Sequence, residues 1–386
     1  MMNIDVLFFE RTLADLKKFA FKISKELKLI DSTIKISAVT VEMPGEKDTN
    51  DLDVFIPRRD IKDIDSFLKG NGVKIMVFTQ TRIPDMEFIL HCKKLGIKTV
   101  MIQEGVMFDG MNINDVSVAN AFAILGYLPK VMEYFHILWN MCRYDKTSFT
   151  KVVWHFLTKK KNITLTIAKE FSIHLIGDYI LTMGEYWDEY YLNKHGYKKE
   201  QIRLIGDHDL DGFTPKGDNE VAICYIANVL VEDGTVKKKD FDEFLKAFAD
   251  AVDKKTKLYI KLHPRSNKDL YNIFNGHNVE FIRNGSLPSV NVYVGHRSAL
   301  LGRALYESDT LIIWRFACEE VCFYEQYATA TCTTPDELKK ALSEVNLKSH
   351  SNDKLDTISK VYWNNPNGSM KSAALLINDY MNNKTI

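Results

Sequence analysis

Short apolar runs alternate with longer amphipathic stretches along most of the chain. The apolar runs have the pattern expected of strands. In the first half we expect strands at residues 4–9, 34–41, 53–56, 74–78 and 99–103. Residues 84–95 carry apolar side chains at helical spacing and stop before Gly96, a typical helix C-cap. This order is typical of parallel strands joined by crossover helices, and it predicts an α/β fold.

The same alternation returns in the second half after a polar interruption. We expect strands at residues 178–183, 202–205, 221–226, 257–262, 279–282, 290–294 and 310–314. We expect helices at residues 187–190, 239–252, 298–307 and 371–381, and a further helix near Asp269. The last helix is long enough to fold back across the molecule toward its N-terminal half.

Domain organisation follows from a polar stretch at residues 207–219, which holds two glycines and Pro215. A chain of 386 residues is more often two domains than one. We therefore expect an N-terminal domain at residues 1–206 that binds an acceptor and a C-terminal domain at 207–365 that binds a nucleotide donor. Residues 366–386 form the helix that returns to the N-terminal domain.

Residues 117–176 interrupt the alternation with an aromatic-rich helical segment that contains Lys159, Lys160 and Lys161. Apolar aromatics beside lysines suit a helix that lies on anionic lipid, and the segment also suits acceptor binding. An ordinary packed helix pair with a solvated lysine turn explains the pattern equally well. All three interpretations stay open at this stage.

Composition narrows the class of partner. Lysine plus arginine and aspartate plus glutamate each number 51, so no excess charge points to nucleic acid or membrane as the main partner. No stretch reaches the roughly 20 apolar residues that span a bilayer, and the N-terminal residues lack the features of a signal peptide. The six cysteines form no Cys-x-x-Cys pair, which favours reduced thiols. We expect a cytoplasmic protein, in contact with the inner membrane at most.

A histidine and an arginine flank a proline where the strand at 257–262 ends, in the order His263, Pro264 and Arg265. Open α/β sheets bind ligands beyond the carboxyl ends of their strands. The proline fixes the loop, so that both side chains can face an anion. The imidazole could donate to a leaving phosphate oxygen, while the guanidinium could clamp a phosphate. A turn that only stiffens the loop is the alternative.

A second loop of this kind follows the strand at residues 290–294. Gly295 permits close backbone approach, and Ser298 can cap a helix whose free N–H groups favour a phosphate. Arg297 and Ala299 belong to the same loop. We expect Gly295, Arg297, Ser298 and Ala299 to bind the donor phosphate together with Arg265.

Two acidic positions compete for the role of general base. Glu104 follows the strand at 99–103 and precedes Gly105, where a carboxylate could deprotonate a sugar hydroxyl. Asp233 lies in Glu232-Asp233-Gly234, which also reads as a turn. The spacing of Asp207 and Asp209 resembles a metal-binding pair, but its place at the domain boundary favours a solvated acidic turn, and we expect no metal site.

With these residues in place, the chain resembles the GT-B superfamily of glycosyltransferases and, within it, bacterial sialyltransferases and polysialyltransferases. The resemblance is carried by the residues from Lys261 to Arg265, the loop from Gly295 to Leu300, and the run from Asp178 to Gly206. It implies two Rossmann-like domains that face a central cleft.

The resemblance also implies roles for single residues. His263 would contact the donor phosphate and assist the departure of CMP, and Ser298 would bind that phosphate. The acidic residue would activate the acceptor hydroxyl: Asp233 matches the family's motif by letters, and Glu104 matches by position, with Gln103 in place of the first acid. The departure at Gln103 bears on whether the donor is a sialic acid.

These expectations combine into an inverting, metal-independent glycosyltransferase without a bound cofactor. Its substrates would be a nucleotide-sugar donor, a CMP-linked sialic or other nonulosonic acid, and a glycan acceptor of a capsule or lipopolysaccharide. The alternatives are a CDP-glycerol-type polyol-phosphate transferase and another nucleotide-sugar-dependent polysaccharide glycosyltransferase. A non-catalytic binding protein of an export complex and a nucleotide-sugar epimerase are further alternatives.

Overall fold

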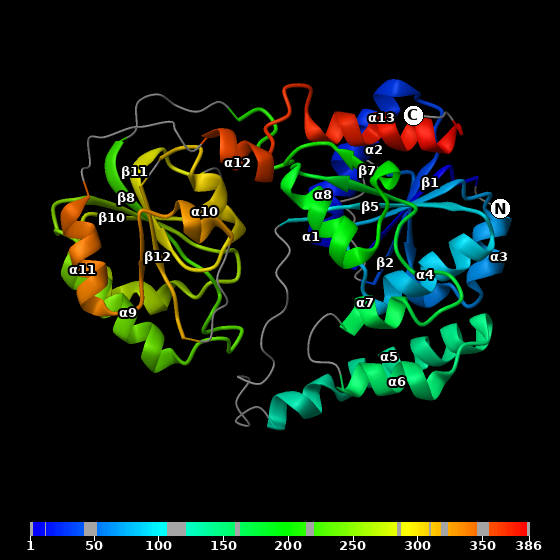
Figure 1. The fold of residues 1–386 in the computed structure, drawn as a ribbon, viewed down its shortest axis with the longest axis horizontal. Helices are drawn as coiled ribbons and strands as arrows, with labels where there is room; N and C mark the ends of the chain where they lie inside the picture. Colours follow the sequence, from blue (N-terminus) through cyan, green and yellow to red (C-terminus); the bar gives the residue numbers. More distant parts are fainter. Residues whose placement is uncertain are drawn as a thin grey trace. The chain divides into compact units, whose positions relative to one another are not determined.

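The computed structural model describes residues 3–11, 13–41, 52–105, 121–158, 163–213, 220–283, 287–308, 310–317, 323–345 and 355–383. The chain divides into two compact units. Unit 1 comprises Met1–Gly105, Phe122–Phe213 and Lys360–Ile386, and unit 2 comprises mainly Thr214–Ser359. Each unit is built around one parallel sheet (Figure 1).

The sheet of unit 1 has seven parallel strands in the order β3-β2-β1-β4-β5-β6-β7. Its strands are β1 (Val6–Glu10), β2 (Ile36–Thr40), β3 (Val54–Pro57), β4 (Ile75–Phe78), β5 (Lys98–Ile102), β6 (Tyr179–Thr182) and β7 (Ile202–Leu204). The central strands are apolar on both faces because helices cover both. The order reverses between β1 and β4, which marks a topological switch point.

Helices of unit 1 pack on both faces of this sheet. They are α1 (Leu13–Asp15), α2 (Phe21–Ile30), α3 (Ile64–Gly70), α4 (Ile83–Lys94), α8 (Tyr186–Tyr190) and α13 (Ser369–Met381), with short helical turns η1 (Leu16–Ala20), η3 (Arg58–Asp60), η6 (Tyr191–His195) and η7 (Lys199–Gln201). As predicted, α4 ends before Gly96, whose φ of +71° suits a residue without a Cβ. The C-terminal helix α13 lies along α2 (Figure 1) and buries Ala373, Ala374 and Ile377 in the same core.

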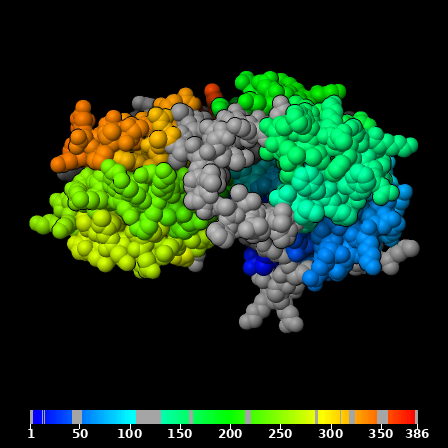
Figure 2. Space-filling model, turned by 90° about the horizontal axis from the view of Figure 1, so that it is seen from below, coloured from blue at the N-terminus to red at the C-terminus, as the bar shows by residue number. Residues whose placement is uncertain are grey.

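Three further helices make up the described part of the expected helical insertion: α5 (Ala121–Asp145), α6 (Phe149–Thr158) and α7 (Ile163–Ala168). Aromatic contacts join α5 to α6, namely Phe135 with Phe156 and Trp139 with Phe149. Figure 2 looks onto the surface that these helices form. Lys159, Lys160 and Lys161 lie outside the described residues.

The sheet of unit 2 has six parallel strands in the order β10-β9-β8-β11-β12-β13. Its strands are β8 (Glu220–Ile226), β9 (Lys257–Lys261), β10 (Val279–Ile282), β11 (Val290–Gly295), β12 (Thr310–Trp314) and β13 (Ala330–Cys332). Its helices are α9 (Lys238–Ala251), η8 (Lys268–Phe274), α10 (Ala299–Ala304), η9 (Phe323–Tyr327) and α11 (Pro335–Glu344), and α12 (Leu355–Val361) spans the passage back to unit 1. Here the order reverses between β8 and β11.

Every strand that the apolar pattern predicts is present, and the pattern missed only the short β13 among the described strands. The helix expected near Asp269 is the 3-10 helix η8, and the helix expected over residues 298–307 is α-helical only over α10. The units part at Phe213 and again at Ser359, not at 206 and 365. The reason is that residues 207–211 bond to the returning chain: Asp207 N–H donates to the Trp363 carbonyl, and Asp211 binds the start of α13.

Within the part of the chain that the structure describes, no helix is both long and apolar enough to cross a bilayer.

The start of α13 supplies a test of this packing. Asp211 accepts hydrogen bonds from the backbone N–H and the hydroxyl of Ser369 at 2.7 and 2.8 Å, so a residue 158 positions earlier caps the helix. Loss of a helix cap costs about 1 kcal/mol. We expect Asp211→Ala to lower the free energy of unfolding by about that amount in urea titrations. Glu200→Ala, which removes an exposed acid of the same unit, should change it little, and equal effects would contradict the capping role.

Candidate functional site

The carboxyl end of β8 is the centre of the candidate site in unit 2. As the chain leaves β8, Ala227 N–H donates to the Lys261 carbonyl at the end of β9 at 2.9 Å. On the other side the Asn228 side-chain amide donates to the Arg297 carbonyl beyond β11 at 2.8 Å. The two loops that the sequence singled out therefore lie at one edge of the sheet, at its switch point, where parallel α/β sheets bind ligands.

The His263 ring is half-buried and has a defined tautomer. Its Nδ1 accepts a hydrogen bond from the backbone N–H of Arg265 at 3.1 Å, so the neutral ring carries its proton on Nε2. Burial, and next the charge of Arg265, lower the pKa of His263. Near neutral pH the ring is therefore an uncharged donor through Nε2–H.

Arg283 fixes the loop around this histidine. Its guanidinium donates to the carbonyl of Pro264 at 2.6 Å and to that of Ser266 at 2.9 Å. Nothing in the sequence pattern points to Arg283, because it follows β10, the strand that lies next to β9 in the sheet. These bonds make Arg283 a positioning residue for His263.

The acidic motif of unit 2 is bound to the same loop. Both carboxylate oxygens of Asp233 accept from the Arg265 guanidinium, at 2.7 and 3.0 Å, and Glu232 accepts from the Asn267 N–H at 2.7 Å. Gly234, with φ of +70°, closes the turn that the sequence also allowed. Asp233 is thus engaged with a cation, which makes it a weaker candidate for the base. Arg265 would have to exchange this partner in order to clamp a phosphate.

The serine loop is built as expected at its centre. The Ser298 hydroxyl caps α10 by accepting from Leu300 N–H at 3.3 Å, and the Ser298 N–H donates to the Tyr324 hydroxyl at 2.6 Å. Gly295 has a packing reason: a Cβ there would lie 3.1 Å from the Ile226 carbonyl and from the Leu301 side chain. Arg297 and Ala299 are half-buried beside Ser298.

His296, between these residues, belongs to the core. It is fully buried, its Nδ1–H donates to the Trp314 carbonyl, and its Nε2 accepts from the Tyr225 hydroxyl, each at 3.0 Å. Burial lowers the pKa of His296 to about 4, so the ring stays neutral. We assign it to packing and to the support of the β11 end.

In unit 1, Glu104 follows β5 at the carboxyl edge, as predicted. Its carboxylate accepts from the Gln80 side-chain amide and lies 3.8 Å from the Lys18 ammonium, and its side chain is 23% exposed. Gln103 is buried, and it joins the ends of β5 and β6 by accepting from Met183 N–H at 3.1 Å. Gln103 therefore has a structural task, and Glu104 is the residue of this pair that can reach a ligand.

A second carboxyl lies at the switch point of unit 1 and was missed from the sequence. Glu10, the last residue of β1, is 1% exposed. Its Oε2 accepts from the Thr79 hydroxyl at 3.0 Å and from Arg82 at 3.4 Å, whereas Oε1 is buried without a hydrogen-bond partner among the described residues. Arg82 is held mainly by the buried Asp85. Burial raises the pKa of Glu10 well above its usual value.

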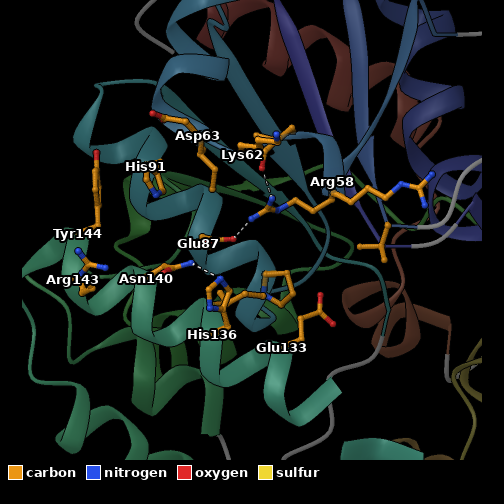
Figure 3. A pocket seen from close by; sticks show the side chains of 16 residues that line it. Arg58, Lys62, Asp63, Glu87, His91, Glu133, His136, Asn140, Arg143 and Tyr144 are labelled. Carbon is orange, nitrogen blue, oxygen red and sulfur yellow. Dashed lines mark hydrogen bonds and ion pairs between the residues drawn. The ribbon is translucent and has the colours of Figure 1, made fainter. Parts of the chain in front are cut away.

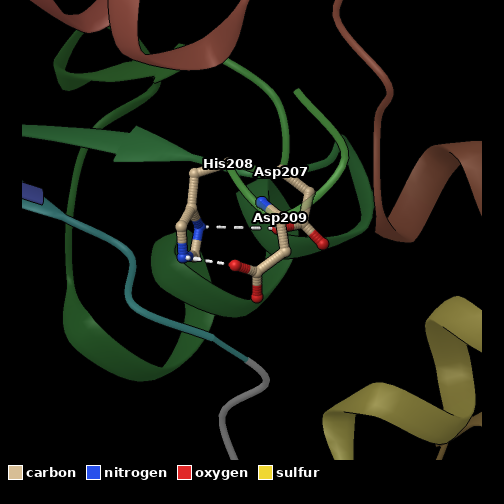
Figure 4. Close-up of side chains that lie close together, drawn as sticks. All are labelled: Asp207, His208 and Asp209. Atoms are coloured by element: carbon tan, nitrogen blue, oxygen red, sulfur yellow. Dashed lines mark hydrogen bonds and ion pairs between the residues drawn. The ribbon is translucent and has the colours of Figure 1, made fainter. Parts of the chain in front are cut away.

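The acidic run at residues 207–211 differs from the expected solvated turn. Asp207 and His208 are buried, and His208 packs on Phe19. The His208 ring nitrogens lie 3.5 Å from Asp207 and 3.2 Å from Asp209 (Figure 4). Ligand atoms of the three side chains lie within 4.8 Å of one another, a spacing that could also hold a cation. The group packs against Phe19 through His208, and the Asp207 N–H bonds to the Trp363 carbonyl.

The charge state of His263 can be measured directly. Burial and Arg265 lower its pKa, while Asp233 and Glu232 oppose this effect. We expect the ring to titrate below 6.5 in heteronuclear NMR. Arg265→Ala should raise the pKa because it removes a positive charge and frees Asp233, and Asp233→Asn should lower it. Shifts in the same direction for both variants would contradict this arrangement.

Glu10 makes stability depend on pH. Its pKa is raised on folding, so the native state binds more protons and loses stability as the pH rises from the unfolded value, about 4.5, through the native value. Glu10→Gln removes this loss. We expect the variant to melt at a higher temperature than the parent at pH 7, with a gain that shrinks as the pH falls and vanishes near pH 4. Glu200→Gln is the control, and a gain that does not change with pH would refute the assignment.

No protein-family model and no curated protein matches the sequence. Solved structures do match over nearly the whole chain. A protein of Listeria monocytogenes described as a UDP-N-acetylglucosamine 2-epimerase covers 100% of this chain with 98% of its own, at a TM-score of 0.58 and 11% identity. The Medicago truncatula protein UGT71G1, solved with UDP-glucose, matches with a TM-score of 0.54 and 9% identity, and the match covers 98% of each of the two chains.

A glycosyltransferase of Rickettsia africae covers 99% of this chain and 100% of its own, with a TM-score of 0.51 and 11% identity. Identities this low establish the fold alone. The expected fold class is confirmed: each unit has the parallel sheet and flanking helices of a Rossmann-like domain, and the chain has the GT-B fold.

Proposed function

We propose that the protein is a glycosyltransferase that uses a nucleotide-activated sugar. The observation that carries the proposal is the pair of loops at the switch point of unit 2, where Asn228 bonds to the Arg297 carbonyl and Ala227 to the Lys261 carbonyl. One loop carries His263, whose neutral ring has its proton on Nε2, and the other carries the serine-capped start of α10. Both follow strands at the edge where such sheets bind nucleotides. The solved transferases of the same fold support the class of reaction.

In the proposed reaction the acceptor hydroxyl attacks the anomeric carbon, and the bond from that carbon to the phosphate oxygen breaks. His263 stabilises the leaving phosphate by donating from Nε2, and Ser298 with its neighbours Gly295, Arg297 and Ala299 binds it. Arg265 assists after it exchanges Asp233 for the phosphate. Glu104 takes the acceptor proton. The configuration at the anomeric carbon inverts because the acceptor hydroxyl attacks the face opposite the leaving phosphate.

For the donor we propose a CMP-linked sialic or other nonulosonic acid, and for the acceptor a cell-surface glycan at the cytoplasmic face of the membrane. The motifs around His263 and Ser298 support this choice. The alternative donor is a UDP sugar, favoured by the UDP-glucose bound to UGT71G1. A CDP-glycerol donor fits the same two loops. An epimerase is the second candidate, favoured by the Listeria structure, and it would release a free sugar product.

His263→Ala tests the donor site. The loss of one positioned donor to the leaving group should lower kcat by about 100-fold or more, since general acid–base groups contribute about 10²- to 10⁴-fold. His277→Ala is the matched control, because His277 precedes β10 at the amino edge of the same sheet. Transfer that survives both His263→Ala and Glu104→Ala would favour a non-catalytic binding protein.

The donor panel should contain CMP-, CDP- and UDP-activated sugars, with products identified by mass spectrometry after incubation with simple glycan acceptors. We expect transfer from the CMP donor and unchanged turnover in EDTA. Turnover that stops in EDTA, returns with magnesium and is lost in Asp209→Asn would assign a metal to the group at Asp207, His208 and Asp209. Release, without an acceptor, of a free sugar with inverted configuration at one carbon would identify an epimerase, whereas release of the unchanged sugar would be donor hydrolysis.

A further inference from the structure

Unit 1 holds a cavity of about 920 Å³. Neither Glu104 nor the loops that carry His263 and Ser298 line it. Its walls are the chain after β3, the start of α3, one side of α4 and the exposed side of α5 (Figure 3). It begins at the carboxyl edge of the sheet, near Arg58 and Pro84, and extends along α4 to His91. Cavities of this volume hold drug-sized molecules, so this one has room for more than one sugar unit.

The wall that the chain after β3 forms is held in place by contacts within the protein. Arg58 forms an ion pair with the nearly buried Glu87 at 2.5 Å, donates to the Ile61 carbonyl at 3.0 Å and lies over the Phe88 ring. These contacts hold the guanidinium of Arg58 from two sides and over a ring. It is therefore a fixed part of the wall and not a group that waits for a ligand.

The far end of the cavity is preorganised by a carboxylate outside it. Asp65 accepts from the Tyr144 hydroxyl at 3.0 Å and contacts His91 Nδ1 at 2.7 Å, and the two rings stack with centroids 4.0 Å apart. Burial and the bond to Asp65 raise the pKa of Tyr144 to about 12, so the hydroxyl stays protonated. A flat aromatic wall of this kind suits the apolar face of a sugar ring.

The remaining charges on the walls favour an anion. Within the described part of the chain, the exposed side chains of Lys62 and Arg143 have no ion-pair partner, and Arg59 has only a weak contact of 3.9 Å with Asp60. The acids on the wall are Glu87, which is paired, Asp63, which caps α3 by accepting from Ser66 N–H, and the exposed Glu133 on α5. The wall thus carries four cationic side chains, Arg58, Arg59, Lys62 and Arg143, against three acidic ones. Asn140 and His136, bonded to each other at 3.2 Å, add groups that can bind hydroxyls.

We propose that this cavity is the subsite that binds the body of an anionic glycan, with Lys62 and Arg143 on its carboxylates or phosphates and Tyr144 against a ring. The cavity's place beside the carboxyl edge of β3 and β4 lets a chain run from there along α4. That this glycan is the acceptor rests on the proposed transferase function. Its binding to unit 1 does not.

The test measures binding without transfer. Purified full-length protein is titrated by calorimetry with an oligosialic acid tetramer and with a neutral maltotetraose of the same length. We expect the tetramer to bind at least tenfold more tightly and to weaken as salt rises, because exposed charge pairs are screened. Lys62→Glu and Arg143→Glu should each weaken the tetramer by about tenfold, whereas Lys69→Glu, on the outer side of α3, should not.

Lack of tetramer binding to the parent protein, equal binding of the neutral oligomer, or normal binding by both reversal variants would overturn the proposal. If a reversal variant does not fold, as judged by its melting curve, Lys62→Ala and Asn140→Ala replace it, with the same outcomes.

His263→Ala should bind the tetramer as the parent does. A parent that binds the tetramer but transfers no sugar would refute the proposed function and leave the subsite standing. A subsite for the acceptor further requires a higher acceptor KM in Lys62→Ala with the donor KM unchanged.

Discussion

The hydrogen bonds made by the chain as it leaves β8 hold the candidate donor site together. Ala227 fixes the end of β9 and Asn228 fixes the loop after β11, so both loops take their positions from one strand. This arrangement depends on the strand order. Where the order reverses, β8 lies between β9 and β11, so the loops that follow both neighbours lie beside its carboxyl end. The histidine, the serine and their supports Arg283 and Tyr324 follow from that geometry.

The sequence predicted the strands well because the central ones, such as β4 and β11, are mostly apolar runs buried on both faces, and such runs are easy to recognise. The positions of His263, Ser298 and Glu104 at the carboxyl edges of the sheets could be predicted for the same reason, since each lies in the loop after such a run. Their roles stay predictions. Asn228, Arg283 and Tyr324 could not, because their partners come from other strands and nothing local marks them. Glu10 could not be singled out either, because it is the last residue of a strand whose other residues are all apolar.

The run at residues 207–211 shows why burial is harder to predict than secondary structure. Three aspartates around a histidine read locally as a solvated turn. Their surroundings are set by segments roughly 150 residues later in the chain: the Trp363 carbonyl accepts from the Asp207 N–H, and the start of α13 is capped by Asp211. The same return of the chain moved the division between the units from the expected position to Phe213.

The two switch points have similar topology and different chemistry. The edge of unit 2 offers hydrogen-bond donors: a neutral histidine with its proton on Nε2, and a serine at a helix start. The edge of unit 1 carries carboxyls, with Glu104 partly exposed and Glu10 buried beside Arg82 and Asp85. A leaving phosphate needs donors, and an acceptor hydroxyl needs a base. One fold used twice, with donors in one copy and carboxyls in the other, is what the proposed transfer reaction requires.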